Sequence, residues 1–197
     1  MPTVIVATGN PGKLKEMQVY LNTLGWRLQL KPEDLDIEET GTTFLENARL
    51  KAAGVAKALG QWAIADDSGL AVDALGGAPG IYSARYADSD HARIERLLKE
   101  LEGKELALKG DRTAQFICAL ALADPAGEII LETEGICSGE ILLSPRGTGG
   151  FGYDPIFYVP ALGKSFAEMS PAQKDSNSHR GIAFSQLLPE MSKLALG

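Results

Sequence analysis

Short hydrophobic runs alternate with stretches of helical periodicity in the first half of the chain, and this order limits the fold more than any other feature. Thr3–Ala7 predicts a buried strand, and the apolar residues of 14–24 then recur every three or four positions. A helix is predicted over 44–59, and Trp62–Ala65 predicts another buried strand that stops at Asp66. Strands and helices in this order are typical of an α/β fold.

The pattern changes in the second half of the chain. Apolar residues of Thr113–Ala123 share one face, Asp124–Gly127 is a turn, and Glu128–Ile136 returns as a strand, which predicts a long antiparallel hairpin. We therefore expect a mixed β-sheet with flanking helices. The 197 residues contain no linker or repeat, so residues 1–197 are predicted to form a single domain. The last helix is expected from about Ser178, with Pro189 kinking or splitting it.

Charge and cysteine content exclude several classes of protein. The formal net charge of −7 disfavours binding to a nucleic acid polymer or an anionic membrane, because both need a basic surface. Cys118 and Cys137 lie in strand-like runs without the spacing of a zinc site, as expected for buried thiols of a reducing cytoplasm. The longest uncharged stretch, Met1–Gly12, is too short to span a bilayer, so a cytoplasmic protein is predicted.

The first candidate site is the loop between the first strand and the first helix. Backbone N–H groups at a helix N-terminus stabilise an anion, and the lysine that ends the loop adds a full positive charge. The spacing differs from a Walker A loop, and a plain turn is the alternative. The loop comprises Thr8, Gly9, Asn10, Pro11, Gly12 and Lys13.

The second candidate is the acidic pair Asp66-Asp67, followed by Ser68. Adjacent carboxylates are costly unless a cation, a metal or a proton accompanies them, and oxygen ligands suit Mg²⁺. A solvated turn is the alternative. Glu38 and Glu39 precede the second helix and could add metal ligands, although acidic residues at a helix N-terminus are also favourable by themselves.

Two further loops contain groups suited to a nucleobase. Phe151-Gly152-Tyr153-Asp154 combines an aromatic ring for stacking with glycines that let the backbone approach a ligand. Lys174, His179 and Arg180 are cations or donors gathered in an acidic chain. Together with the first two candidates, these residues supply what nucleotide hydrolysis requires.

These motifs occur in the order found in one enzyme family. The blocks include Thr8-Gly9-Asn10, Ala65-Asp66-Asp67-Ser68-Gly69, Gly76–Arg85, Gly147–Pro155 and Ser178-His179-Arg180-Gly181, with Glu46-Asn47-Ala48 between the first two. The chain resembles the inosine/xanthosine triphosphate pyrophosphatase family, which removes deaminated purine nucleotides. The resemblance implies Mg²⁺-dependent hydrolysis of ITP, dITP and XTP to the monophosphate and pyrophosphate. It also implies a homodimer and an elongated, two-lobed domain with a central cleft.

The resemblance also implies a role for each matching residue. Asp67 is expected to be the general base and a metal ligand, with Asp66 beside it and Glu38 or Glu39 as the acidic metal partner. Thr8 to Lys13 is expected to bind the triphosphate with help from Lys51, and Ser68 to contact the substrate. The nucleoside pocket is expected to contain Phe151, Gly152, Tyr153, Asp154, Lys174, His179 and Arg180.

Two alternative functions remain at this stage. One is a phosphatase or nucleotidase that releases orthophosphate, and the other is a non-catalytic purine nucleotide sensor. Retention of both Asp66 and Asp67 disfavours the sensor, which needs no base. The segment Ala87–Asp111 matches no functional motif and is expected to be variable surface.

Overall fold

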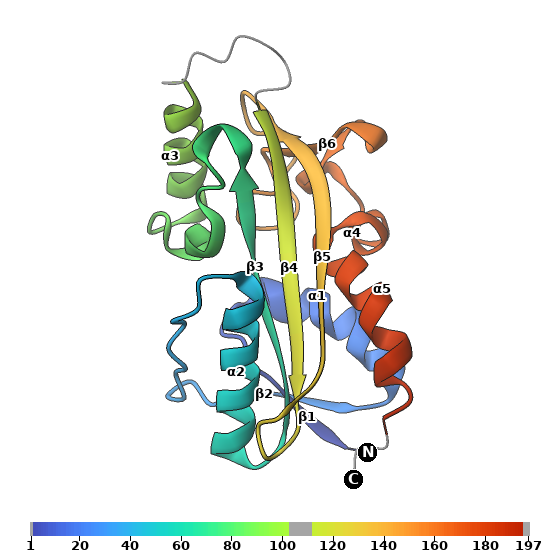
Figure 1. The fold of residues 1–197 in the computed structure, drawn as a ribbon. Helices are drawn as coiled ribbons and strands as arrows, with labels where there is room; N and C mark the ends of the chain where they lie inside the picture. The colour runs from blue at the N-terminus through green and yellow to red at the C-terminus, as the bar shows by residue number, and fades with distance from the viewer. Residues whose placement is uncertain (1, 103–111, 195–197) are drawn as a thin grey trace. The chain divides into compact units, whose positions relative to one another are not determined.

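The structure is a computed structural model that describes residues 2–102 and 112–194. Its strands form one seven-stranded sheet in the order β2-β1-β3-β4-β5-β6-β7 (Figure 1). β1 pairs in parallel with β2 and with β3, whereas β6 pairs antiparallel with β5 and with β7. The predicted α/β fold with a mixed sheet is confirmed. The strands are β1 Thr3–Val6, β2 Arg27–Leu30, β3 Trp62–Val72, β4 Thr113–Ala123, β5 Ile129–Ile141, β6 Phe157–Val159 and β7 Lys164–Ser165.

The helices begin where the sequence supplies capping residues. Asn10 caps α1, Thr43 caps α2 and Ser170 caps α4, each accepting a hydrogen bond from a first-turn N–H group. The last helix, α5, continues two residues beyond Pro189, so it is not split there. The helical spacing of Ile94, Leu97 and Leu101 predicts a helix that ends at Gly103; α3 corresponds to this helix, and Gly103 lies outside the described residues. The helices are α1 Pro11–Leu21, α2 Phe44–Leu59, α3 Asp90–Glu102, α4 Pro171–Asn177 and α5 His179–Met191.

The prediction that a strand stops at Asp66 is wrong. β3 runs through Asp66-Asp67-Ser68-Gly69 to Val72, and both carboxylates lie inside it. Buried charges are tolerated in a strand when cations from neighbouring elements compensate them. Lysine and arginine side chains that are distant in the sequence do so here, and a pattern that considers only local residues cannot include them.

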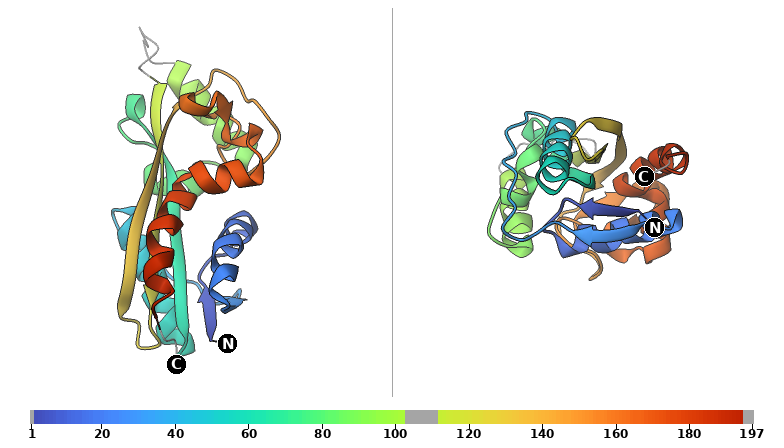
Figure 2. Two further views of the ribbon diagram at one scale, coloured as in Figure 1. Left: turned by 90° about the vertical axis from the view of Figure 1, so that its right-hand side faces the viewer. Right: turned by 90° about the horizontal axis from the view of Figure 1, so that it is seen from below.

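The chain divides into two compact units. Unit 1 comprises residues 1–67, 118–135 and 180–197, and unit 2 comprises residues 68–117 and 136–179. In unit 1, α1 and α5 pack on one face of the strands through a cluster that includes Val6, Ile64, Met17 and Phe184. Figure 2 shows α2 on the opposite side from α1. Unit 1 is thus a three-layered arrangement with strands in the middle.

Aromatic rings from several elements form the centre of unit 2. The ring centroids of Phe116 and Phe157 lie 4.7 Å apart, and those of Phe157 and Phe166 lie 4.8 Å apart. The His179 imidazole stacks on Phe116 at 4.6 Å with an interplanar angle of 12°. Aromatic pairs of this kind add stabilisation beyond the area they bury. The packing fixes the chain that follows the glycine-rich segment 147–155, where Phe157 and Phe166 lie.

Candidate active site

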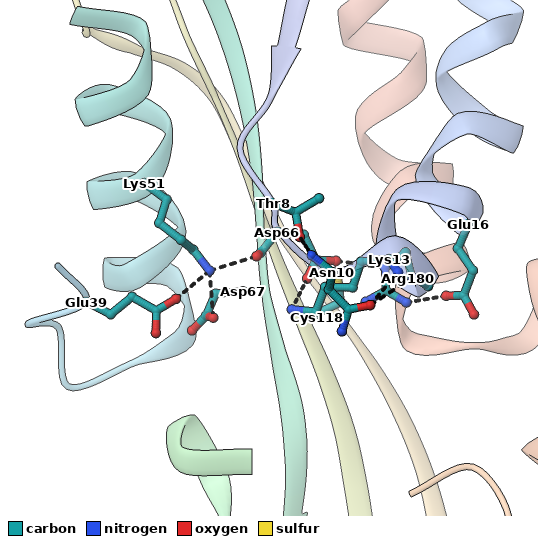
Figure 3. A network of polar contacts seen from close by, with 11 residues as sticks. Thr8, Asn10, Lys13, Glu16, Glu39, Lys51, Asp66, Asp67, Cys118 and Arg180 are labelled. Atoms are coloured by element: carbon teal, nitrogen blue, oxygen red, sulfur yellow. Dashed lines mark hydrogen bonds and ion pairs between the residues drawn. The ribbon is translucent and has the colours of Figure 1, made fainter. Parts of the chain in front are cut away.

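Asp66 and Asp67 point in opposite directions because they are consecutive residues of an extended strand (Figure 3). The Asp66 side chain lies on the α1 and α5 side, whereas the Asp67 side chain lies on the α2 side. Each carboxylate therefore has its own set of cations. The two neighbouring carboxylates consequently have different electrostatic surroundings.

The Asp66 carboxylate is fully enclosed in an ionic network. Its Oδ1 atom lies 2.7 Å from Lys13 Nζ, and its Oδ2 atom accepts a hydrogen bond of 2.7 Å from Arg180 Nε. Arg180 also donates to Glu16 through Nη1, and the Cys118 thiol donates to Asp66 Oδ2 at 3.2 Å. Burial would raise the pKa of Asp66, but Arg180 and Lys13 outweigh it and hold that pKa well below its usual range. Asp66 is therefore ionised, and its two oxygen atoms are engaged by Lys13 and Arg180.

Asp67 is held differently. Its Oδ1 atom lies 2.9 Å from Lys51 Nζ, and its Oδ2 atom is buried without a hydrogen-bond partner among the described residues. Burial raises the pKa of Asp67 above its ordinary value, although Lys51 and Lys13 oppose this. A buried carboxylate oxygen without a partner is costly, so it is poised to accept a hydrogen bond or a proton.

Lys51 contacts both Glu39 and Asp67 on the α2 side of β3. Its ammonium group contacts Glu39 Oε1 at 2.8 Å, Asp67 Oδ1 at 2.9 Å and the Asp66 carbonyl oxygen at 2.9 Å. Burial would lower the pKa of Lys51, but the carboxylates of Asp67 and Glu39 raise it overall. The lysine therefore remains protonated between two carboxylates.

The structure separates the two glutamates that the sequence left as alternatives. Glu39 shares Lys51 with Asp67, whereas Glu38 is exposed and forms no ion pair with any described residue. Glu39 and Asp67 are thus the carboxylates that could hold a metal ion together. The described residues contain no group of three metal-ligating side chains. Two carboxylates nevertheless suit Mg²⁺, which commonly takes its other ligands from phosphates and water.

Asn47 fixes the segment that carries Glu39. The Asn47 side chain is fully buried in α2, and its Oδ1 atom accepts a hydrogen bond of 2.8 Å from the Gly41 N–H group. A Cβ atom at Gly41 would lie 2.7 Å from Asn47 Oδ1, so only glycine fits this close approach. In the sequence, Asn47 is recognisable only as part of the Glu46-Asn47-Ala48 motif, which indicates no role for its side chain.

The loop from Thr8 to Lys13 is a tightly capped helix start. Thr8 Oγ1 accepts the Asn10 N–H group at 3.1 Å, and Asn10 Oδ1 accepts the N–H groups of Gly12 and Lys13 at 2.8 and 3.2 Å. Asn10 therefore already uses two of the donors expected for an anion. Gly9 has no atom within 4 Å of the place where a Cβ would be, which leaves open space beside the backbone.

In unit 2, Asp154 organises the predicted base-binding residues. Its Oδ2 atom accepts the Phe151 N–H group at 2.9 Å and contacts Lys174 Nζ at 2.6 Å. The same ammonium group lies 5.0 Å from the centroid of the Phe151 ring. The structure thus brings Phe151, Asp154 and Lys174 together, with the Lys174 charge close to an aromatic face.

The other predicted residues of the nucleoside pocket have varied surroundings. The Tyr153 hydroxyl is buried and donates to the Ser83 carbonyl oxygen at 2.9 Å, so this ring is committed to the interior of unit 2. His179 is buried on the Phe116 ring. Ser68 is half-buried in β3 of unit 2, whereas Arg180 belongs to unit 1 and contacts Asp66.

Comparison with known proteins decides the family. The sequence model of the Ham1 family matches residues 4–190. The chain belongs to the Ham1 family. A dITP/XTP pyrophosphatase of Synechocystis sp. is 62% identical over 188 residues, which cover 95% of this chain and 94% of that protein. A dITP/XTP pyrophosphatase of Nostoc sp. is 61% identical over 97% of this chain and 95% of that protein.

Solved structures of the Ham1 family have the same fold. A HAM1 protein from Coxiella burnetii is 43% identical, with a TM-score of 0.89 and coverage of 98% of this chain and 100% of that chain. The Ham1 protein of Staphylococcus aureus is 45% identical, with a TM-score of 0.83 and coverage of 96% and 97%. The resemblance noted in the sequence is thereby confirmed at the level of family and fold.

Proposed function

We propose that this chain hydrolyses the deaminated purine nucleoside triphosphates ITP, dITP and XTP to the nucleoside monophosphate and pyrophosphate. The observation that carries the proposal is the difference between Asp66, whose two oxygens contact Lys13 and Arg180, and Asp67, whose buried Oδ2 atom has no hydrogen-bond partner among the described residues. Relatives named dITP/XTP pyrophosphatase that are 62% and 61% identical support the substrate class.

Asp67 acts as the general base in this mechanism. Its Oδ2 atom accepts a proton from a water molecule as the water oxygen attacks the α-phosphorus. The bond from the α-phosphorus to the bridging oxygen breaks, and pyrophosphate leaves with that oxygen. A raised pKa suits this role because a base works best when its pKa lies closer to the working pH.

Cationic side chains of unit 1 stabilise the triphosphate. Lys13 at the start of α1 and Lys51 on α2 supply positive charge where negative charge develops on the leaving pyrophosphate. The Asp66 carboxylate, which Arg180 also contacts, holds Lys13 in place. Glu39 and Asp67 are the residues we propose to hold Mg²⁺, which when bound neutralises phosphate charge.

We propose that unit 2 recognises the nucleoside. Phe151 offers a ring for stacking, and the Lys174 ammonium group beside it is a donor suited to the 6-oxo oxygen of hypoxanthine or xanthine. Adenine carries an amino group at that position, so a donor would meet a donor. Buried polar groups left without a partner can discriminate between substrates by about 10⁴-fold.

A product assay tests the function directly. The chain is incubated with ITP, XTP, dITP, GTP or ATP in the presence of Mg²⁺, and pyrophosphate and orthophosphate are measured separately. Pyrophosphate from the deaminated nucleotides is expected. Orthophosphate as the direct product would instead support a phosphatase, and tight ITP binding without turnover would support a nucleotide sensor.

Substitution of the proposed base provides the mechanistic test. Asp67→Asn is expected to lower kcat by about 10²–10⁴-fold and to leave the fold intact, because the Oδ2 atom it replaces has no partner in the part of the chain that the structure describes. Asp36→Asn is the matched control, since Asp36 is exposed and forms no hydrogen bond or ion pair with any described residue. Full activity of Asp67→Asn would refute the assigned role.

We further propose a cytoplasmic homodimer. Cys118 and Cys137 are free thiols, as is usual in a reducing compartment. Ile136 and Leu143 of unit 2 are 47% and 80% exposed, and we propose that a second copy of the chain covers them. None of the described helices is both long and apolar enough to cross a bilayer. Sedimentation equilibrium and cell fractionation test the two proposals.

A further inference from the structure

The glycine-rich loop that carries Phe151 is held by two carboxylates. The Phe151 N–H group donates to Asp154 Oδ2 at 2.9 Å, and the next N–H group, that of Gly152, donates to Asp90 Oδ2 at 2.7 Å. Asp154 is a neighbour in the sequence, but Asp90 is 62 positions away, at the start of α3. All of these residues belong to unit 2.

Asp90 is itself held firmly. Its Oδ1 atom accepts a hydrogen bond of 2.7 Å from Arg93 Nη1, and Arg93 Nε donates to the Ala87 carbonyl oxygen at 3.0 Å. Ser89 caps the helix start, with its Oγ atom accepting the Ala92 N–H group at 3.2 Å. The carboxylate that reaches Gly152 is therefore fixed by its own helix rather than by the loop it contacts.

The loop needs such an anchor because of its backbone. Gly150 and Gly152 have φ angles of +73° and +61°, which glycine adopts easily but which leave the loop with many alternative conformations. A hydrogen bond between a backbone N–H and a carboxylate is among the stronger kinds. Two such bonds to consecutive N–H groups restrict the direction in which the Phe151 ring points.

We propose that Asp90 is a positioning residue for nucleoside recognition, which acts by fixing Gly152 and thereby the Phe151 ring. The inference rests on the proposed function, in which Phe151 stacks on the purine. Asp90 touches no reacting atom. Its loss therefore affects the ordering of the loop on substrate binding and leaves the chemistry at Asp67 unchanged.

Steady-state kinetics with ITP separate positioning from structure. Asp90→Ala is expected to raise KM by about three- to tenfold, the range of one ordinary hydrogen bond lost at an exposed position, with kcat within twofold. Asp90→Asn keeps an acceptor oxygen and is expected to restore KM to within about twofold. Asp88→Ala is the matched control, because Asp88 is exposed and forms no hydrogen bond with any described residue.

A second measurement does not depend on turnover. Hydrogen exchange of the Gly152 amide, followed by NMR in the protein without nucleotide, is expected to accelerate in Asp90→Ala and to stay slow in Asp88→Ala. An unchanged KM or an unchanged exchange rate in Asp90→Ala would overturn the proposal. So would an equal loss of thermal stability and kcat in Asp90→Ala that Asp90→Asn does not restore, since that pattern indicates a purely structural role.

The two proposals fail in different ways. If the natural chain released no pyrophosphate from any purine triphosphate, the proposed function would be lost, and so would the role of Asp90 in that reaction. If the natural chain were active and Asp90→Ala kept its KM, only the positioning role would be lost.

Discussion

Asp66 and Arg180 form a buried ion pair in unit 1, with Oδ2 and Nε 2.7 Å apart and side chains that are 0% and 1% exposed. The residues are 114 positions apart in the sequence. Removing one partner of a buried pair is costly because it leaves the other charge uncompensated. The pair thus ties β3 to the start of α5.

The first prediction concerns the energy of this pair. Arg180→Leu is expected to lower the free energy of unfolding by about 3–5 kcal/mol. Asp66→Asn combined with Arg180→Leu is expected to cost less than the sum of the single changes, because the two groups interact directly. Urea unfolding of the natural chain, the two single variants and the double variant measures this difference in the free energy of unfolding. Arg27→Leu, at an exposed position of β2, is the control, and strict additivity would contradict the prediction.

The second prediction concerns acid stability. The pKa of Asp66 is well below its usual range in the folded chain, whereas in the unfolded chain it is about 3.9. Its contribution to stability is therefore complete above about pH 4 and is lost as the pH falls through the lowered folded-state pKa. Urea midpoints between pH 5 and pH 2 are expected to fall more steeply for the natural chain than for Asp66→Asn. Parallel curves would show that another group dominates.

The third prediction tests the close approach of Gly41 to α2. In Gly41→Ala, the added Cβ would lie 2.7 Å from both Asn47 Oδ1 and Glu46 Cβ, so the segment that carries Glu39 has to shift. We expect a loss of about 1–3 kcal/mol in the free energy of unfolding, measured by thermal denaturation. Gly9→Ala is the control for stability, since nothing lies within 4 Å of its added Cβ. Equal midpoints for the two variants would contradict the prediction.

The fourth prediction concerns the two thiols. Burial raises the pKa of Cys137 to about 11, and burial together with the nearby Asp66 carboxylate raises the pKa of Cys118 well above its ordinary value. Both thiols are therefore protonated and poor nucleophiles at pH 8. A chromogenic disulfide reagent is expected to react slowly with the native chain and rapidly with both thiols in denaturant. Rapid reaction of the native chain would show that burial does not protect them.

The sequence predicted much of the fold because local patterns were strong. The helix over 44–59 and the long hairpin strands appear as expected, since the apolar spacing of 44–59 and the turn at Asp124–Gly127 specify them locally. The predicted end of β3 at Asp66 was wrong because the cations that compensate Asp66 and Asp67 come from other elements. A pattern of neighbouring residues does not include partners that only folding brings close.

The candidate site shows the same limit. The acidic pair and the lysines could be found as motifs, but Glu16 and Asp90 were missed. Glu16 contacts Arg180 from 164 positions away, and Asp90 contacts Gly152 from 62 positions away. Asp90 also lies in a segment expected to be variable surface. Asp90 is an ordinary residue at the start of a helix and Glu16 an ordinary one inside it, so no sequence signal marked them.

The alternation of side chains along β3 has a consequence for how this site tolerates insertions. One residue added between Trp62 and Ala65 would turn Asp66 toward Lys51 and Asp67 toward Arg180, because each step along a strand reverses the face. Two added residues would restore the original facing. The surroundings of Asp66 and Asp67 are therefore kept only when an even number of residues is inserted into β3 before Asp66.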